Sequence, residues 1–241
     1  MTNLYRTNEK YQVVEYGSRK EWLESRIGCI GASDASCVLG LNPYKTKEQF
    51  IQDKITNNIK LSQKGAMKYG QENESLIREL FKIDYRTKYQ VDYTENVNVF
   101  SIEYPFLSCS PDSLLLEIGR KMQGRKGILE IKTAYVKNEE ELQQWNHNLP
   151  TNYYIQVLHQ LLVMSDMEFA VLRAKLKIYD RKTKEYEYLI KDYYIERKDV
   201  QADIDYLLRK EIEFVLEHRD IDFKALTDEF AITLCKTLEN E

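Results

Sequence analysis

The stretch that decides the fold is Ser110-Pro111-Asp112, followed after a run of strand and turn by Leu129-Glu130-Ile131-Lys132. The neighbours of Glu130 are apolar, which indicates a central strand. Side chains alternate along a strand, so Glu130 and Lys132 are expected on the same face. A central strand rarely carries charges without a partner or a metal ion. The segment therefore predicts a β-sheet that holds a polar site.

Asp112 begins the strand expected over 113–118, which is expected to pair with the strand over 127–133. Asp112 and Glu130 together offer the hard oxygen ligands that Mg²⁺ prefers. Lys132 is then placed to hold or polarise an attacking water. This Asp…Glu-x-Lys pattern is typical of metal-dependent nucleases. The pattern alone leaves a second interpretation open, in which Glu130 and Lys132 form a solvent-facing ion pair.

The rest of the chain surrounds these strands with helices. Further strands are expected at 11–15 and 106–110, with hairpins at 91–99 and 169–194. Ser33 is expected to cap a short helix, and Pro150 to open a longer one. The remaining helices are expected at 18–26, after Thr46, at 67–85, at 138–145 and in two segments after 195. The order predicts an α/β or α+β fold with a central mixed β-sheet flanked by helices.

The composition sets limits on the class of protein. The chain has 241 residues, 43% of them hydrophobic, which excludes a disordered protein and fits one domain over 1–241. No apolar run is long enough for a membrane helix, and the first fifteen residues lack the apolar core of a signal peptide. We therefore expect a cytoplasmic protein without membrane contact. The four cysteines form no CxxC pair and are expected to be free thiols.

The net charge of −4 argues against a purely electrostatic nucleic-acid binder. The charge is unevenly distributed, however. Residues 196–241 hold 7 Lys/Arg and 13 Asp/Glu, whereas residues 1–195 hold 28 and 26. The acidity therefore lies in the C-terminal amphipathic helices (196–241), outside the expected catalytic core (about 15–195). Within the core, basic surfaces are predicted near Arg26, at Lys60–Lys68 and at 120–126.

Four sequence blocks, in order, carry a resemblance to a known family. They are Trp22–Tyr44 with its Arg26-Ile27-Gly28 and Gly31-Ala32-Ser33-Asp34 segments, Gly70-x-x-x-Glu74 running into Phe81, the Ser110–Lys132 segment, and Trp145 with Tyr154-Ile155-Gln156-Val157. These blocks resemble the phage lambda exonuclease / YqaJ-like viral recombinase family of the PD-(D/E)xK nucleases. The resemblance spans about residues 15–195 and implies a restriction-endonuclease-like PD-(D/E)xK core.

The resemblance implies a catalytic site. Asp112 and Glu130 match the metal-binding carboxylates, the backbone carbonyl of Ile131 matches a further ligand, and Lys132 matches the catalytic lysine. Glu74 matches a helix-borne carboxylate that completes the site, with one or two Mg²⁺ ions bound and Mn²⁺ as a substitute. From the residues alone, an exposed Glu74 beside Glu72 is an equal alternative.

The resemblance also implies residues that contact DNA. Arg26, Ser33 and Ser110 match residues that hold a 5′-terminal phosphate, and Gln156 matches a helix glutamine near the site. Leu158 stands where the family often has a second glutamine, which puts a second polar contact in doubt. The link between Asp112 and Glu130 appears longer than in lambda exonuclease and is basic. We predict that it meets DNA phosphates, with a solvated hairpin tip as the alternative; its cations are Arg120, Lys121, Arg125 and Lys126.

The function implied is a Mg²⁺-dependent 5′-to-3′ exonuclease that digests one strand of linear double-stranded DNA with a 5′-phosphate end. It would leave 3′ single-stranded tails for phage-type recombination. A single-strand-annealing recombinase as partner, a homotrimeric ring, and a phage or prophage origin in a bacterial host are implied as well. The alternatives are another PD-(D/E)xK nuclease (RecB-like, CRISPR-associated or an endonuclease) and a DNA-end-binding protein without turnover.

Overall fold

Two mixed β-sheets form the framework of the computed structural model, which describes residues 4–56, 65–119, 124–180 and 183–239. The first sheet has the order β1-β4-β5-β2 and consists of β1 (Tyr11–Glu15), β4 (Val97–Ser101), β5 (Leu107–Cys109) and β2 (Ile30–Gly31). The second has the order β3-β6-β7-β8-β9 and consists of β3 (Tyr89–Asp92), β6 (Ser113–Glu117), β7 (Lys126–Val136), β8 (Phe169–Asp180) and β9 (Glu185–Glu196).

The sheet pairings confirm the α+β class and correct one expected hairpin. Strands β6 and β7 pair antiparallel, as do β8 and β9, while β7 and β8 run parallel. The segment 91–99 was expected to be a hairpin, but β3 pairs with β6 and β4 pairs with β1 and β5. Alternation of apolar residues indicates a strand without naming its partner, and here the two strands belong to different sheets.

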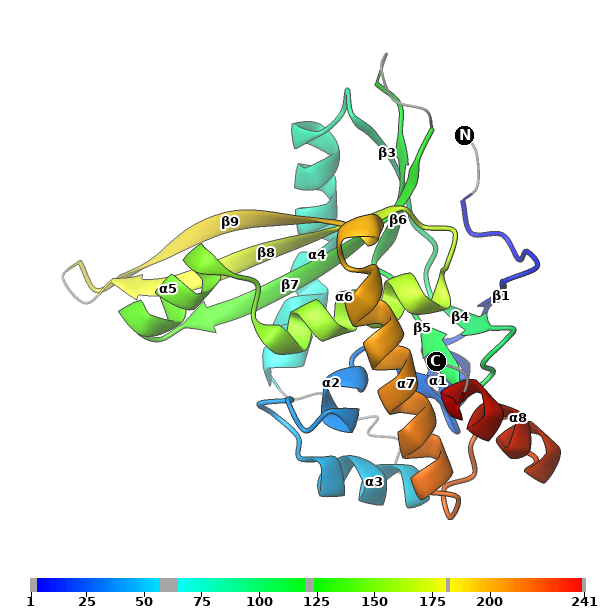
Figure 1. Ribbon diagram of the computed structural model, residues 1–241. Helices are drawn as coiled ribbons and strands as arrows, with labels where there is room; N and C mark the ends of the chain where they lie inside the picture. Colours follow the sequence, from blue (N-terminus) through cyan, green and yellow to red (C-terminus); the bar gives the residue numbers. More distant parts are fainter. Residues whose placement is uncertain (1–3, 57–64, 120–123, 181–182, 240–241) are drawn as a thin grey trace.

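Helices connect and cover these strands (Figure 1). Local sequence explains several of their starts: Thr46 forms a capping box with Gln49, and Ser18 and Asn138 cap their helices through side-chain oxygens. Ser33 does not cap a helix, because the short helix α2 begins after Asp34 with no side-chain cap. The helices are α1 (Arg19–Glu24), α2 (Ala35–Val38), α3 (Lys47–Ile55), α4 (Gly65–Asp84), α5 (Glu139–His147), α6 (Thr151–Val163), α7 (Gln201–Glu217) and α8 (Asp228–Glu239).

Two helices cover the second sheet from opposite sides (Figure 1). Helix α6 buries Val157 and Leu161 in the main core, against strands and α7. Helix α4 buries Ile77 and Phe81 in a second core with Leu129 and other residues of β7 and β8. The strand that carries Glu130 is therefore covered on both faces, as a central strand should be. None of the described helices is long and apolar enough to span a membrane.

Strand β6 is much shorter than its neighbour β7. It pairs with β7 only from Leu116↔Lys126 to Ser113↔Leu129, whereas β7 and β8 stay paired as far as Val136↔Ile178. Beyond Leu129, β7, β8 and β9 continue as a three-stranded ribbon that projects from the body of the molecule (Figure 1), which we call the arm. The early end of β6 leaves a notch beside residues 130–132 of β7.

Candidate functional site

Asp112 immediately precedes β6 and fills the notch. Its Oδ2 accepts a hydrogen bond from the backbone N–H of Ile131 at 2.6 Å. The pairing of β6 with β7 stops at Ser113↔Leu129, so no residue of β6 lies opposite Ile131. The carboxylate therefore takes the place of a ladder acceptor and is held beside the strand that carries Glu130 and Lys132.

Glu130 lies at the centre of the site and is only 2% exposed. Its Oε1 accepts hydrogen bonds from Lys132 Nζ at 2.6 Å and from Gln156 Nε2 at 2.5 Å. Its Oε2 accepts one from Gln160 Nε2 at 2.5 Å. Gln156 and Gln160 are one helical turn apart on α6 and face the same carboxylate. Three donors, one of them charged, explain how this carboxylate can be buried.

Glu74 reaches the same region from α4. It forms an ion pair with Arg78, whose Nε donates to Ser113 Oγ at 2.9 Å. The Arg78 guanidinium also lies 3.5 Å from the ring centre of Tyr93. Arg78 thereby fixes the middle of α4 to the start of β6, next to Asp112. Glu74 is half-buried rather than fully exposed, which favours the site over the surface interpretation.

The charges at the notch perturb one another. Burial raises the pKa of Asp112 well above its usual range, and the negative charges of Glu130 and Glu74 raise it further. Burial also raises the pKa of Glu74, more than Arg78 lowers it. Burial alone would lower the pKa of Lys132, but Glu130 and Asp112 outweigh it and raise that pKa, so the ammonium is retained. The notch therefore concentrates carboxylates that repel each other.

The carboxylate oxygens at the notch are suitable ligands for a divalent cation. Burial, and then the negative charges of Glu130 and Glu74, raise the pKa of Asp112, and a bound cation would offset these effects by stabilising the carboxylate. Within the described residues, no three His, Cys, Asp or Glu side chains converge as a ready-made metal cage. The ligand set implied here is smaller: Asp112, Glu130 and the Ile131 carbonyl. That is compatible with Mg²⁺, which is usually bound through one or two carboxylates and keeps several waters.

The structure also brings Arg26, Ser33 and Ser110 into one cluster, and Trp22 links them. Arg26 Nη2 is 3.4 Å from Ser33 Oγ, and its guanidinium lies 5.0 Å from the Trp22 ring. Trp22 Nε1 donates to Ser110 Oγ at 3.1 Å. A Cβ on Gly31 would lie 2.9 Å from Arg26 Nη2, so a glycine leaves room for the guanidinium. Trp22 is half-buried and supports this cluster through its ring and its indole N–H.

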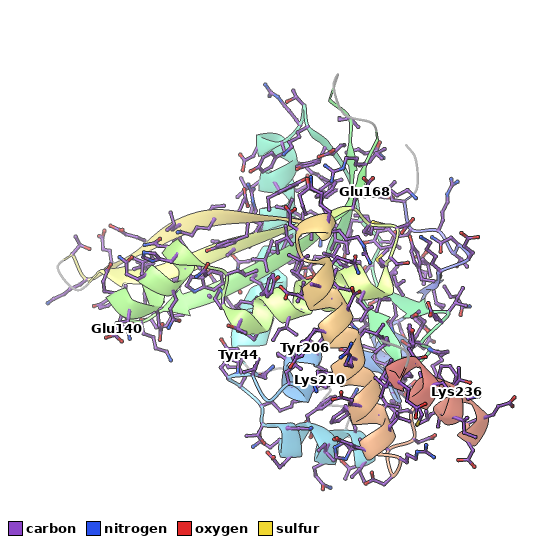
Figure 2. The ribbon with its side chains drawn as sticks, viewed as in Figure 1. Tyr44, Glu140, Glu168, Tyr206, Lys210 and Lys236 are labelled. Carbon is purple, nitrogen blue, oxygen red and sulfur yellow. The ribbon has the colours of Figure 1, made fainter. Side chains whose placement is uncertain are left out.

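The basic link between β6 and β7 is less suited to DNA than predicted. Arg120 and Lys121 lie outside the described residues, as does the 60–64 part of the Lys60–Lys68 stretch. Arg125 is held by three carboxylates: Glu168 at 3.1 Å, Glu196 and, at 3.8 Å, Glu117 (Figure 2 labels Glu168).

Lys126 is likewise paired within the chain, with Asp166 at 3.1 Å. The charges of Arg125 and Lys126 are therefore neutralised by the protein itself, which argues against a role in holding phosphates.

Two residues of the site escape the sequence patterns. Gln160 is fully buried and supplies the second amide at Glu130. Leu158, where the family often has a glutamine, lies in the core instead. The spacing of Gln156 and Gln160 was the available signal, because residues four apart share a helix face. Arg78 is the second residue that the sequence patterns missed, and its position four residues after Glu74 was the available signal.

Comparison with known proteins assigns the family. The model of the YqaJ-like viral recombinase domain matches residues 21–168. The uncharacterized protein YqaJ of Bacillus subtilis (strain 168) is 34% identical over 149 residues, which are 61% of this chain and 43% of that protein. The match thus spans less than half the length of this relative.

Solved structures agree on the fold. A crystal structure of an alkaline exonuclease (LHK-Exo) from Laribacter hongkongensis superposes with a TM-score of 0.54 at 18% identity, covering 92% of this chain and all (100%) of that one. Its complex with dAMP gives 0.52 at 18% identity, over 83% and 94%. The chain belongs to the YqaJ-like viral recombinase domain family.

Proposed function

We propose that this protein is a Mg²⁺-dependent exonuclease that digests one strand of linear double-stranded DNA in the 5′-to-3′ direction and leaves a 3′ single-stranded tail. The observation that carries the proposal is the notch, where Asp112, Glu130 and Lys132 meet beside an open strand edge. Membership of the YqaJ-like family supports it.

The residues at the notch have separate tasks in this proposal. Asp112, Glu130 and the Ile131 carbonyl would hold the cation, with Glu74 completing the site and Mn²⁺ able to replace Mg²⁺. When bound, the cation supplies Lewis-acid stabilisation of the charge that develops on the scissile phosphate. Lys132 keeps its proton and orients the attacking water through an N–H donor. Gln156 and Gln160 hold Glu130 in one orientation.

A second set of residues would recognise the DNA end. The Arg26 guanidinium can bind a terminal phosphate through two N–H groups, and the hydroxyls of Ser33 and Ser110 lie in the same cluster. The Arg26 guanidinium lies over the Trp22 ring, and this contact restrains the direction of the guanidinium. We therefore assign the preference for 5′-phosphate ends to this cluster.

The proposal extends to the protein's setting. By resemblance to lambda exonuclease, we propose a homotrimeric ring around DNA, a single-strand-annealing recombinase as partner, and a cytoplasmic phage or prophage enzyme in a bacterial host. A ring gives processivity because the enzyme cannot leave the strand without passing an end.

The deciding experiment is digestion of three matched substrates with and without Mg²⁺: linear duplex with 5′-phosphate ends, the same duplex with 5′-hydroxyl ends, and a closed circle. We expect metal-dependent loss of one strand from the phosphorylated duplex, slower loss from the hydroxyl duplex, and an intact circle. Equal cutting of the circle would contradict an exonuclease. In Arg26→Ala, the preference for the phosphorylated end should disappear.

The Lys132→Ala variant tests the placement of the catalytic lysine. We expect cleavage to fall about 10²-fold or more, because a charged donor beside the reacting groups is lost, while duplex DNA measured in EDTA still binds. Lys236→Ala, which changes an exposed lysine on α8, is the control and should cleave normally (Figure 2). A normal cleavage rate in Lys132→Ala would mean that the site is misplaced.

A further inference from the structure

The outer part of the arm carries a group of exposed tyrosines that no core explains. Tyr135, Tyr186 and Tyr188 are 49%, 48% and 53% exposed, and Tyr179 is also exposed. We define the tyrosine–lysine patch by its residues: Tyr135 of β7, Lys177 and Tyr179 of β8, and Tyr186 and Tyr188 of β9. Tyrosine is common in strands, but a contiguous exposed aromatic group usually marks an interaction site.

The members of the patch contact one another. The Tyr186 ring lies 5.3 Å from that of Tyr179 and 6.2 Å from that of Tyr135, between ring centres. Lys177 Nζ lies 3.9 Å from the centre of the Tyr186 ring. Lys175, one pleat further in, lies 4.9 Å from the Tyr188 ring. The patch is thus one continuous surface of rings with ammonium groups among them.

The strand register separates positive from negative charge on the arm. Lys177 is opposite Tyr188, and Tyr179 is opposite Tyr186, so these four share a face. Along that face, β8 carries Lys175, Lys177 and Tyr179, and β9 carries Tyr186, Tyr188 and Ile190. The acidic residues Glu185 and Glu187 alternate to the opposite face. The patch therefore combines aromatic rings with positive charge, which fits a flexible polyanion that has planar groups.

We propose that the tyrosine–lysine patch binds single-stranded DNA, with unpaired bases stacked on its tyrosines and phosphates paired with its lysines. Aromatic platforms with interspersed cations bind single strands in this way. Bases in a duplex are already stacked, so only unpaired bases can use the rings. The inference rests on the proposed function in one respect: digestion of one strand leaves the other single-stranded at the site.

The position of the patch supports this assignment. Tyr135 is three residues beyond Lys132 on β7, about 10 Å along the strand, and this odd spacing places it on the opposite face of the sheet, which is covered by α4, the helix that carries Glu74. The arm extends from the notch without interruption, because β7 to β9 remain paired throughout. A single strand that crosses the edge of β7 left open beyond β6 would pass onto this face of the arm and meet the patch.

The test measures binding of a fluorescent oligothymidylate of about 16 nucleotides by anisotropy, in EDTA so that no cleavage occurs. Tyr186→Ala and Tyr188→Ala remove one stacking ring each, and Tyr186→Phe keeps the ring. The matched control is Tyr206→Ala on α7, because Tyr206 is also exposed and has Lys210 Nζ at 5.7 Å from its ring (Figure 2).

We expect Tyr186→Ala and Tyr188→Ala each to weaken binding about fivefold or more, since stacking contributes about 1–3 kcal/mol per base. Tyr186→Phe and Tyr206→Ala should bind like the wild type. Equal binding by Tyr186→Ala, an equal loss in Tyr206→Ala, or an equal loss for a closed hairpin duplex would overturn the proposal. So would a change of oligomeric state in Tyr186→Ala by light scattering, because the patch would then be a contact between copies of the chain.

The two proposals fail separately. If the wild type binds the oligonucleotide through the patch but digests no linear duplex, the proposed function fails and the patch stands. If digestion proceeds and the alanine variants bind the oligonucleotide normally, the patch alone is refuted.

Discussion

Glu130 organises the site through its own hydrogen bonds. Both of its oxygens are used, by one lysine and by two glutamine amides from successive turns of α6. A glutamine cannot change its charge, so these amides fix the position of the carboxylate without competing with a cation for its charge. Gln160 is more deeply buried than Gln156, and its Oε1 has no hydrogen-bond partner among the residues that the structure describes. Its place in the core is therefore explained by Glu130 alone.

The Gln160→Leu variant tests this dependence. Leucine fills similar space but leaves Glu130 Oε2 without its donor, so we expect the free energy of unfolding to fall by about 1–3 kcal/mol. Urea denaturation measures the loss. Gln143→Leu is the matched control, because Gln143 donates to Glu139 at 2.7 Å on the surface of α5 and its loss should cost little. Unchanged stability in Gln160→Leu would show that Glu130 does not need this amide.

At this scale, the sequence predicts pairs that are close along one element. Alternation predicts that Glu130 and Lys132 share one face, and in the structure their side chains form an ion pair there. Gln160 is one helical turn from Gln156, but this spacing does not distinguish it as a site residue. Most residues of α6 are buried and apolar, so the sequence of the helix indicates only core packing. A buried polar residue in such a helix is identified only when its partner is known, and that partner is on a strand thirty residues away.

Helix α6 is tied to its neighbours by a buried charged pair. His159 Nδ1 lies 2.7 Å from Glu211 Oε1 on α7, and His159 Nε2 lies 3.0 Å from the backbone oxygen of Ser108 on β5. Burial alone would lower the pKa of His159, but Glu211 outweighs it, so the pKa is raised above its ordinary value. The imidazolium therefore links a helix to a helix and to a strand.

This pair makes stability depend on pH. The pKa of His159 is higher in the folded than in the unfolded protein, so its contribution is complete below about pH 6.5 and is lost as the pH rises through the raised value. We expect the free energy of unfolding to fall more steeply above pH 6.5 in the wild type than in the double variant His159→Gln, Glu211→Gln. Denaturation at a series of pH values measures both slopes. Parallel slopes would mean that His159 is not charged in the fold.

At the scale of elements, non-local pairing limits sequence-based prediction. Arg125 belongs to a run of cations that reads as a DNA-binding loop, yet its carboxylate partners Glu168 and Glu196 are 43 and 71 residues further along the chain. The expected hairpin at 91–99 failed for the same reason, because its two strands join different sheets. Local patterns gave the strands themselves, and tertiary contacts decided their partners.

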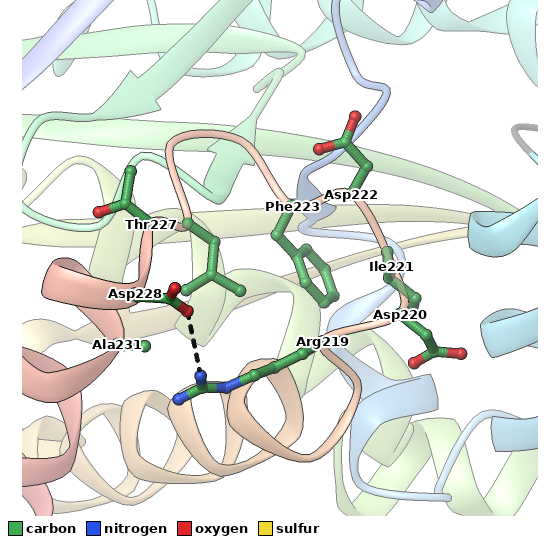
Figure 3. Close-up of a pocket in the computed structure, with 9 residues that line it drawn as sticks. Arg219, Asp220, Ile221, Asp222, Phe223, Thr227, Asp228 and Ala231 are labelled. Carbon is green, nitrogen blue, oxygen red and sulfur yellow. Dashed lines mark ion pairs between the residues drawn. The ribbon is translucent and has the colours of Figure 1, made fainter.

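At the scale of the whole molecule, several aspartates gather at the end opposite the arm. The arm and helix α8 lie at opposite ends of Figure 1. Between α7 and α8, a pocket of about 280 Å³ is bordered by Asp220, Asp222 and Asp228, and Arg219 lies 3.6 Å from Asp228 (Figure 3). These three aspartates therefore lie away from the arm, which lessens the apparent conflict between a net charge of −4 and the proposed DNA substrate.

The double variant Asp220→Asn, Asp222→Asn tests this separation. Removing two negative charges should leave the affinity for 5′-phosphorylated duplex DNA within about twofold at physiological salt, because both carboxylates are exposed and salt weakens interactions between exposed charges. Titrations in EDTA at two salt concentrations measure the affinity, with Arg26→Ala as the variant expected to bind more weakly. Binding that tightens tenfold in the double variant would place DNA beside these helices.

The short β6 strand has a consequence for solubility as well as for the site. A β-strand edge with open N–H groups is a template on which another chain can add a strand. At the notch, the N–H of Ile131 is already bonded to Asp112, a side chain that no incoming backbone can displace without burying a charge. Asp112, which lies where the edge of β7 is left open by β6, thus also protects this edge from unwanted β-sheet extension. Selection against aggregation and selection for activity would therefore act on the same carboxylate.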